Sequence, residues 1–159
     1  CWATPTPPRP PPPPRRRRAG SSPRAPAHRG VQAGAALLLG PSGAGKSQVA
    51  LRMLALGAVL VADDRTELSR EGDHLRAQAP GAIRGLIEAR GIGLLRAPTV
   101  GSARVVLAVD LAQREGARMP PPRIWSALGL EVALIHAPET GCLPSALMLY
   151  LRHGGCIPP

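Results

Sequence analysis

Residues 40–47 read GPSGAGKS and match every position of the pattern G-x-x-x-x-G-K-S/T, which constrains the fold more than any other segment. Its glycines permit a backbone that aims successive N–H groups at phosphate oxygens. A short apolar run at 35–39 precedes the motif, and apolar residues at helical spacing follow it over 48–56. The pattern predicts a buried parallel strand, a phosphate-binding loop, and a helix whose positive N-terminal end faces the phosphate.

We call residues 40–47 the phosphate loop and expect all of them to contact a nucleotide: Gly40, Pro41, Ser42, Gly43, Ala44, Gly45, Lys46 and Ser47. Lys46 would bridge phosphate groups as a point charge, and the Ser47 hydroxyl would ligate Mg²⁺. Lys46 is the only lysine among 20 lysine and arginine residues. A composition that strongly prefers arginine thus has a compact ammonium at the one position that needs it.

Two adjacent aspartates, Asp63 and Asp64, follow an apolar run at 58–62 that reads as the next strand. Ligands of open α/β sheets lie at the carboxyl ends of strands, so at least one aspartate should face the terminal phosphate. Successive strand residues point to opposite sides, which predicts different roles for the two. One would accept a proton from an attacking hydroxyl, and the other would orient water or the metal shell. Asp110 of VVLAVD is a rival for the metal role.

The remaining pattern predicts an α/β fold, a P-loop kinase-like domain with a mixed β-sheet and a C-terminal helix. Aromatic residues make up 2% of the chain and Phe is absent, so the core must consist of Leu, Val, Ile and Ala. The expected elements are a hairpin over 66–77 turning at Gly72, a strand at 104–111, strands at 123–128 and 131–136 broken at Gly129, and a helix at 144–152.

Residues 1–30 hold ten of the 20 prolines and no acidic residue, which predicts a disordered, partly polyproline II tail. A solvated native tail and a non-native upstream segment are both open interpretations. The arginine run at 15–18 suits an acidic surface, but we do not expect nucleic acid to be the partner. Residues 31–159 form the predicted catalytic domain. No segment has eighteen consecutive apolar residues, so we expect no membrane span. Three cysteines without metal-ligand spacing favour the cytoplasm.

The chain resembles the HPr kinase/phosphorylase family, in its short form without an N-terminal domain. The resemblance rests on the phosphate loop, on LGAVLVADD, and on residues 79–95, APGAIRGLIEARGIGLL. The last segment contains the family pattern I-E-x-R-G-x-G as residues 87–93. The resemblance covers about residues 35–125.

This resemblance implies a serine kinase and phosphorylase that uses ATP and Mg²⁺ to modify the phosphocarrier protein HPr, commonly as a homo-hexamer. It implies that Asp64 accepts the proton in phosphorylation and returns it in the reverse reaction, and that Ser47 and Glu88 ligate Mg²⁺. A functional arginine of the family matches Arg118, with Arg123 as the nearby competitor. From the residues alone, Gly91 and Gly93 permit Glu88 and Arg90 to approach one site closely.

Two departures from the family keep alternatives open. The position of a functional histidine of the family falls on Ala25, and the nearest histidine, His28, lies three residues later. The segment APETGCLPSAL, at residues 137–147, resembles the late loop of the family only loosely. The alternatives are a nucleotide-binding module with impaired catalysis and a kinase that acts on a small molecule.

Overall fold

The computed structural model describes residues 2–3, 34–63, 65–80 and 85–155. The elements in chain order are β1 (Trp2–Ala3), β2 (Gly34–Leu39), α1 (Lys46–Ala55), β3 (Val59–Leu60), β4 (Glu67–Glu71), β5 (His74–Gln78), β6 (Leu86–Ala89), β7 (Gly93–Arg96), β8 (Ser102–Glu115), β9 (Ile124–Ala127), β10 (Leu130–Pro138) and α2 (Leu143–His153).

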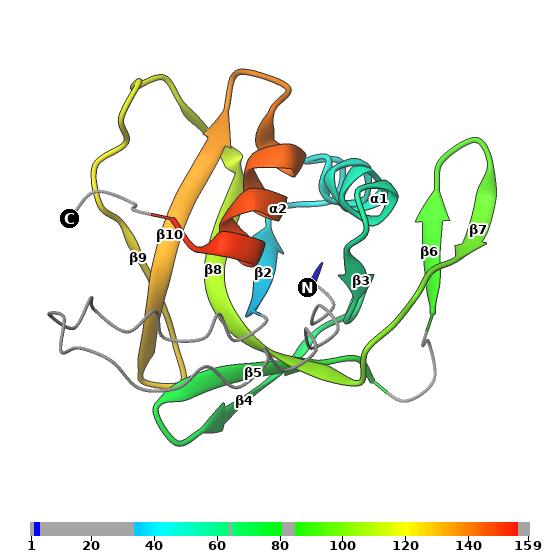
Figure 1. Cartoon of the computed structure of the whole chain (residues 1–159), viewed down its shortest axis with the longest axis horizontal. Helices are drawn as coiled ribbons and strands as arrows, with labels where there is room; N and C mark the ends of the chain where they lie inside the picture. The colour runs from blue at the N-terminus through cyan, green and yellow to red at the C-terminus, as the bar shows by residue number, and fades with distance from the viewer. Residues whose placement is uncertain (1, 4–33, 64, 81–84, 156–159) are drawn as a thin grey trace, which may run out of the picture.

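The main sheet is mixed, as the sequence predicted. Its strands follow the order β3-β1-β2-β8-β10-β9, and the β4–β5 hairpin joins it through β5, which pairs with the start of β8. The strands β2, β8 and β10 are parallel to one another, whereas β1, β5 and β9 are antiparallel to their neighbours. The long, curved β8 runs through the molecule and joins these parts into one sheet (Figure 1). The predicted fold class, an α/β domain with a mixed sheet and a C-terminal helix, is confirmed.

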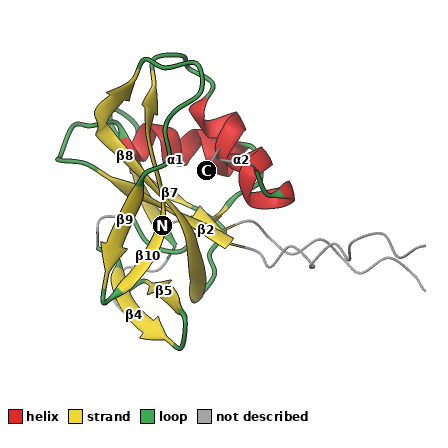
Figure 2. Ribbon diagram, turned by 90° about the vertical axis from the view of Figure 1, so that its left-hand side faces the viewer, coloured by secondary structure: helices red, strands yellow, loops and turns green. Residues whose placement is uncertain are grey.

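Both helices cover the same side of the sheet (Figure 2). Alternation along β2 divides its side chains between two clusters, because successive strand residues point to opposite faces. Ala36 joins the cluster on the helix side, which includes Met53 of α1 and Leu147 of α2. Ala35 and Leu37 join a second cluster on the other face. The first four residues of β2 are therefore buried on both faces of the sheet, as its continuous apolar sequence predicted.

The local predictions largely hold. The helix expected over 48–56 is α1, which ends before Gly57, a glycine with a φ of 90°. The hairpin turns at Gly72, whose φ is 62°. A break at Gly129 separates β9 from β10, and Pro144 lies in the first turn of α2. The run at 58–62 is extended only at Val59–Leu60, so the second strand is shorter than expected.

The N-terminal tail differs from expectation at two residues. Trp2 and Ala3 form β1, which pairs with both β2 and β3, instead of lying in a segment without regular structure. Residue 1 and residues 4–33 lie outside the described residues, so the expectation for the rest of the tail stays a prediction. Neither helix in the described ranges is long and apolar enough to cross a bilayer.

Candidate active site

The phosphate loop connects the end of β2 to the start of α1 and has the backbone geometry that its glycines predicted. Gly40, Gly43 and Gly45 have φ values of 134°, 87° and 95°, a region that disfavours side chains. A Cβ atom at Gly43 or Gly45 would meet nothing within 4 Å, so open space lies beside the loop there. A Cβ atom at Gly40 would lie 2.9 Å from the Cβ of Ala44. Gly40 is thus required by packing as well as by backbone conformation.

Lys46 begins α1, and its side chain folds back over the loop. Its Nζ donates hydrogen bonds to the carbonyl oxygens of Gly40 at 2.7 Å and Pro41 at 2.9 Å. The ammonium therefore lies over the same backbone whose N–H groups would hold phosphate. Ser47 follows in the first turn, where backbone N–H groups lack intrahelical partners. No side chain of the described residues caps this end of the helix, which leaves it suited to an anion.

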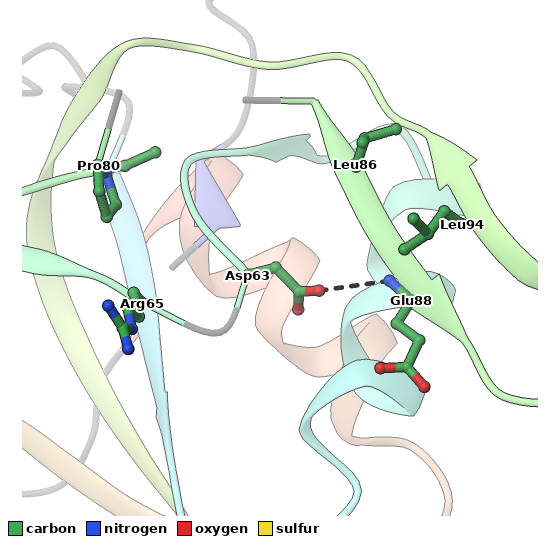
Figure 3. Close-up of a pocket in the computed structure, with 7 residues that line it drawn as sticks. Asp63, Arg65, Pro80, Leu86, Glu88 and Leu94 are labelled. Atoms are coloured by element: carbon green, nitrogen blue, oxygen red, sulfur yellow. Dashed lines mark hydrogen bonds between the residues drawn. The ribbon is translucent and has the colours of Figure 1, made fainter. Parts of the chain in front are cut away.

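The structure brings Asp63 and Glu88 together from segments that are 25 residues apart. The Asp63 Oδ2 atom accepts a hydrogen bond of 3.3 Å from the Glu88 backbone N–H (Figure 3). Glu88 belongs to β6, which pairs with β7 in a separate two-stranded sheet. This hairpin packs against α1, since the neighbouring Ile87 is 1% exposed in the cluster that contains Met53. One region therefore contains Asp63, the β6–β7 hairpin and α1.

A cavity of about 160 Å³ lies between Asp63 and Glu88. Its other lining residues come from the segment after Asp63, the end of the β4–β5 hairpin, and the β6–β7 hairpin: Arg65, Ala79, Pro80, Leu86 and Leu94. Figure 3 shows the Glu88 carboxylate extending away from the hydrogen bond that its backbone makes to Asp63. Asp64, predicted to be the proton acceptor, lies outside the described residues, so its role stays a prediction.

Asp110 lies on β8 directly beside Leu39, the last residue of β2. Its Oδ1 atom accepts a hydrogen bond of 2.9 Å from the Ala112 backbone N–H. Asp110, the alternative metal ligand, therefore lies next to the start of the phosphate loop, on the strand that pairs with β2. Within the described ranges, no three His, Cys, Asp or Glu side chains form a group that would hold a metal by themselves.

The two candidate arginines have different surroundings. Arg123 donates a hydrogen bond of 2.6 Å from Nη1 to Oε2 of Glu115, and both side chains are mostly buried. Arg118 is exposed on the loop between β8 and β9, and the Glu115–Arg123 pair closes the base of that loop. This loop leaves the sheet on the side opposite the β6–β7 hairpin (Figure 1). No hydrogen bond or ion pair among the described residues joins Arg118 to the phosphate loop.

Sequence reasoning missed several features of this region. It identified the glycines near Glu88 but did not predict the β6–β7 hairpin, whose signal was the alternation of Ile87, Glu88 and Ala89 before a glycine turn. Arg65 lines the cavity and directly follows the aspartate pair, so its position was visible in the sequence. The Glu115–Arg123 pair left no local pattern, because its partners lie at the two ends of the loop that connects β8 to β9.

Comparison with known proteins supports one family. The model of the HPr serine kinase C-terminal domain matches residues 30–111. An HPr kinase/phosphorylase of Caldanaerobacter subterraneus subsp. tengcongensis is 49% identical over 100 residues, which are 60% of this chain and 32% of that protein. An HPr kinase/phosphorylase of Brevibacillus brevis is 34% identical over 109 residues, 65% of this chain and 34% of that protein. The chain spans about a third of the length of these curated relatives.

A solved structure agrees with the sequence comparisons. The HPr(Ser) kinase/phosphatase from Coxiella burnetii superposes with a TM-score of 0.61 at 27% identity, covering 74% of this chain and 85% of that one. The resemblance that the three motifs indicated is therefore confirmed.

Proposed function

Because the chain belongs to the HPr serine kinase C-terminal domain family, we propose that it transfers a phosphoryl group from ATP to a serine of the phosphocarrier protein HPr. The curated relatives carry the name HPr kinase/phosphorylase, so the reverse, phosphate-consuming reaction belongs to the same proposal. One observation carries most weight. The Asp63–Glu88 hydrogen bond joins the aspartate motif to the glycine-containing motif, and both lie beside α1, the helix that begins in the phosphate loop.

In the proposed forward step, the serine oxygen attacks the γ-phosphorus of ATP. A new bond forms between serine oxygen and phosphorus, the bond from phosphorus to the β,γ-bridging oxygen breaks, and ADP leaves with that electron pair. The serine proton passes to the Asp64 carboxylate. Asp63, whose Oδ2 atom accepts a hydrogen bond from the Glu88 backbone N–H, would orient water or the metal shell. The loop N–H groups and Lys46 stabilise charge on the transferring group, which such a loose transition state requires.

The residues present fit a magnesium ion. Mg²⁺ prefers oxygen ligands and is usually bound through one or two carboxylates plus substrate phosphates, so a cluster of three protein ligands is not needed. Ser47 and Glu88 would supply a hydroxyl and a carboxylate, with Asp110 as the alternative carboxylate beside β2. When bound, the ion would neutralise charge on the phosphate oxygens.

Three further parts of the proposal depend on the family. Arg118 would contribute positive charge to the transferring phosphoryl group, since Arg123 is already paired with Glu115. HPr would be the partner, and the chain would assemble as a homo-hexamer. The cytoplasmic location favoured by the cysteine pattern stays a prediction.

The substitution Asp64→Asn tests the proton-acceptor role. It should lower single-turnover transfer of labelled phosphate from ATP to HPr by about 10²- to 10⁴-fold, the usual contribution of a positioned general base. The dissociation constant for ATP, measured by titration calorimetry, should stay close to that of the unmodified chain. Asp73→Asn is the matched control, because Asp73 makes the same charge change in the β4–β5 turn, where its side chain is 91% exposed.

Parallel loss of ATP binding and transfer in Asp64→Asn would argue against a base role. If the unmodified chain binds ATP but labels neither HPr nor a small-molecule acceptor, the impaired nucleotide-binding module would replace the kinase as the better description. Labelling of a metabolite instead of HPr would identify the small-molecule kinase.

A further inference from the structure

Residues 116–122 connect β8 to the residue before β9, and we call them the Arg118 loop. In the sheet, β8 and β9 lie on opposite sides of β10, so the loop has to cross β10. The strand β8 ends beside Pro138, at the carboxyl end of β10, and β2, β8 and β10 are parallel. The crossing therefore occurs at the carboxyl edge of the parallel strands, the edge at which the phosphate loop also leaves β2.

Both carboxylate oxygens of Glu115 hold the ends of this loop together. The Oε1 atom accepts a hydrogen bond of 3.0 Å from the Ala117 backbone N–H, and Oε2 accepts one of 2.6 Å from Nη1 of Arg123. The backbone of Arg123 is itself fixed to β10, because its carbonyl oxygen accepts a hydrogen bond of 2.9 Å from the Leu134 N–H. One carboxylate thus joins the start of the Arg118 loop to the residue that follows its end.

A run of prolines restricts the other half of the loop. Pro120, Pro121 and Pro122 have fixed φ angles, and each also restricts the residue before it. Conformational freedom remains chiefly at residues 116–118, and the hydrogen bond from the Ala117 N–H to Glu115 lies in that part. The shape of the loop is therefore set by the prolines on one side of Arg118 and by Glu115 on the other.

The closing pair is shielded from solvent, whereas the residue between its partners is not. The side chains of Glu115 and Arg123 are 11% and 25% exposed. Compared with apolar residues of similar size, a buried ion pair often adds no net stability, but it fixes the geometry of the groups that it joins. Arg118 is exposed, and among the residues that the structure describes no hydrogen bond or ion pair engages it. The pair thus supports a charge that is still available to an anionic ligand.

We propose that Glu115 is a positioning residue for phosphoryl transfer, which holds the Arg118 loop in the shape that presents the Arg118 guanidinium to the transferring group. The inference rests on the proposed function of Arg118 and makes it more specific. Groups that stabilise charge in phosphoryl transfer act best when they are already in place, because no reorganisation is then needed during the reaction. The phosphate loop and Lys46 would bind ATP without this help, so Glu115 should affect the rate of transfer and not the affinity for ATP.

The first test separates the rate of transfer from binding in the full chain. Glu115→Gln should lower the single-turnover rate of phosphate transfer from ATP to HPr about 10- to 100-fold, the scale of a misplaced catalytic group. The dissociation constant for ATP, measured by titration calorimetry, should not change, because the lost interaction is made only in the transition state. Arg123→Gln removes the other half of the ion pair and should act in the same way. Glu131→Gln, at an exposed position of β10, is the matched control and should change neither quantity.

A double substitution distinguishes positioning from a general loss of stability. Arg118→Gln should slow transfer about 10²-fold or more, as expected for loss of a group that stabilises transition-state charge. Adding Glu115→Gln to Arg118→Gln should slow transfer no further, because a residue that acts through Arg118 then has nothing left to position. A merely structural role of Glu115 would add its own loss to that of Arg118→Gln.

The state of the loop is also measurable without catalysis. Trypsin cleaves after arginine, and both Arg118 in the loop and Arg90 at the β6–β7 turn are exposed. In Glu115→Gln, the initial rate of cleavage at Arg118, followed by mass spectrometry, should rise about tenfold or more relative to cleavage at Arg90. This is the scale of losing a hydrogen bond to a charged group. Glu131→Gln should leave the ratio of the two rates unchanged.

The proposal is overturned if Glu115→Gln leaves transfer or the cleavage ratio unchanged, if it weakens ATP binding in parallel with transfer, or if its loss adds to that of Arg118→Gln. Thermal unfolding midpoints close to that of the unmodified chain would show that each variant is folded. If Glu115→Gln does not fold, the same measurements on Arg123→Gln decide the matter. Faster cleavage at Arg118 in Glu115→Gln, with no labelling of HPr by the unmodified chain, would count against the proposed function alone, because the control of the loop by Glu115 would still have been measured.

Discussion

At the scale of single residues, Lys46 has two hydrogen bonds that phosphate binding would replace. Its Nζ contacts the Gly40 and Pro41 carbonyl oxygens at 2.7 and 2.9 Å. Hydrogen bonds between two charged partners are shorter and stronger than those to neutral carbonyls. We therefore expect the ammonium to exchange these carbonyls for phosphate oxygens when a polyphosphate binds.

The substitution Lys46→Met should weaken binding of ATP and pyrophosphate alike. Loss of a hydrogen bond to a charged group costs about 1.5–3 kcal/mol, which corresponds to roughly 10- to 150-fold in the dissociation constant. Titration calorimetry measures both ligands. Arg70→Met, on β4, is the control for loss of one positive charge and should leave both affinities unchanged. Normal pyrophosphate binding by Lys46→Met would contradict the assigned role.

At the scale of elements, Ile87 attaches the β6–β7 hairpin to the core cluster that contains Met53. Within the part of the chain that the structure describes, the two strands pair with each other and form their own sheet. Ile87 is 1% exposed and packs with residues of α1, whereas Ile92, at the turn, is 77% exposed. Glu88 follows Ile87 directly, so the anchor that attaches the hairpin to the core also places the Glu88 backbone N–H near Asp63.

We expect Ile87→Ala to lower the free energy of unfolding by about 2–5 kcal/mol, because it removes buried methyl groups and leaves a cavity. Ile92→Ala makes the same chemical change in the same hairpin and should stay within about 0.5 kcal/mol of the unmodified chain. Urea denaturation followed by circular dichroism measures both. Equal effects of the two substitutions would show that the hairpin is not anchored as described.

At the scale of the whole molecule, ionised acids at two separate places contribute to stability. The Ala117 backbone N–H and the Arg123 side chain lower the pKa of Glu115 below its ordinary value of 4.5. The Arg76 side chain lowers the pKa of Glu71, and the His74 side chain lowers the pKa of Asp73, both in the β4–β5 hairpin. A lowered pKa in the folded state means that the carboxylate stabilises the fold when it is ionised.

The free energy of unfolding should therefore decline as the pH falls below about 4.5 and through the lowered pKa values, with these contributions fully present above that range. Glu115→Gln should remove part of this decline, because the group no longer titrates. Urea titrations at a series of pH values measure it, with the exposed Glu139 changed to Gln as the control. An unchanged pH dependence in Glu115→Gln would contradict the contribution assigned to its hydrogen bonds.

Much of the fold was predictable because its signals are local. The apolar run before residue 40, the glycines of the phosphate loop and the helical spacing after it lie within about 20 residues and predict β2, the loop and α1. Gly72 and Gly129 likewise predict the turns in which they occur. The shortness of β3 was not predictable, since a continuous apolar run does not reveal how many of its residues find a partner strand.

The amino-acid sequence alone determined the phosphate loop, the mixed α/β fold class and the motifs that resemble the family, because each depends on residues near one another in the chain. The tertiary structure decided the Asp63–Glu88 contact, the pairing of Arg123 with Glu115, and the cavity between Asp63 and Glu88. The Asp63–Glu88 contact and the cavity join segments that are distant in sequence, and the Arg123–Glu115 contact spans the whole loop between β8 and β9. Their geometry depends on sheet order and on how side chains pack, and no local spacing of residues encodes either.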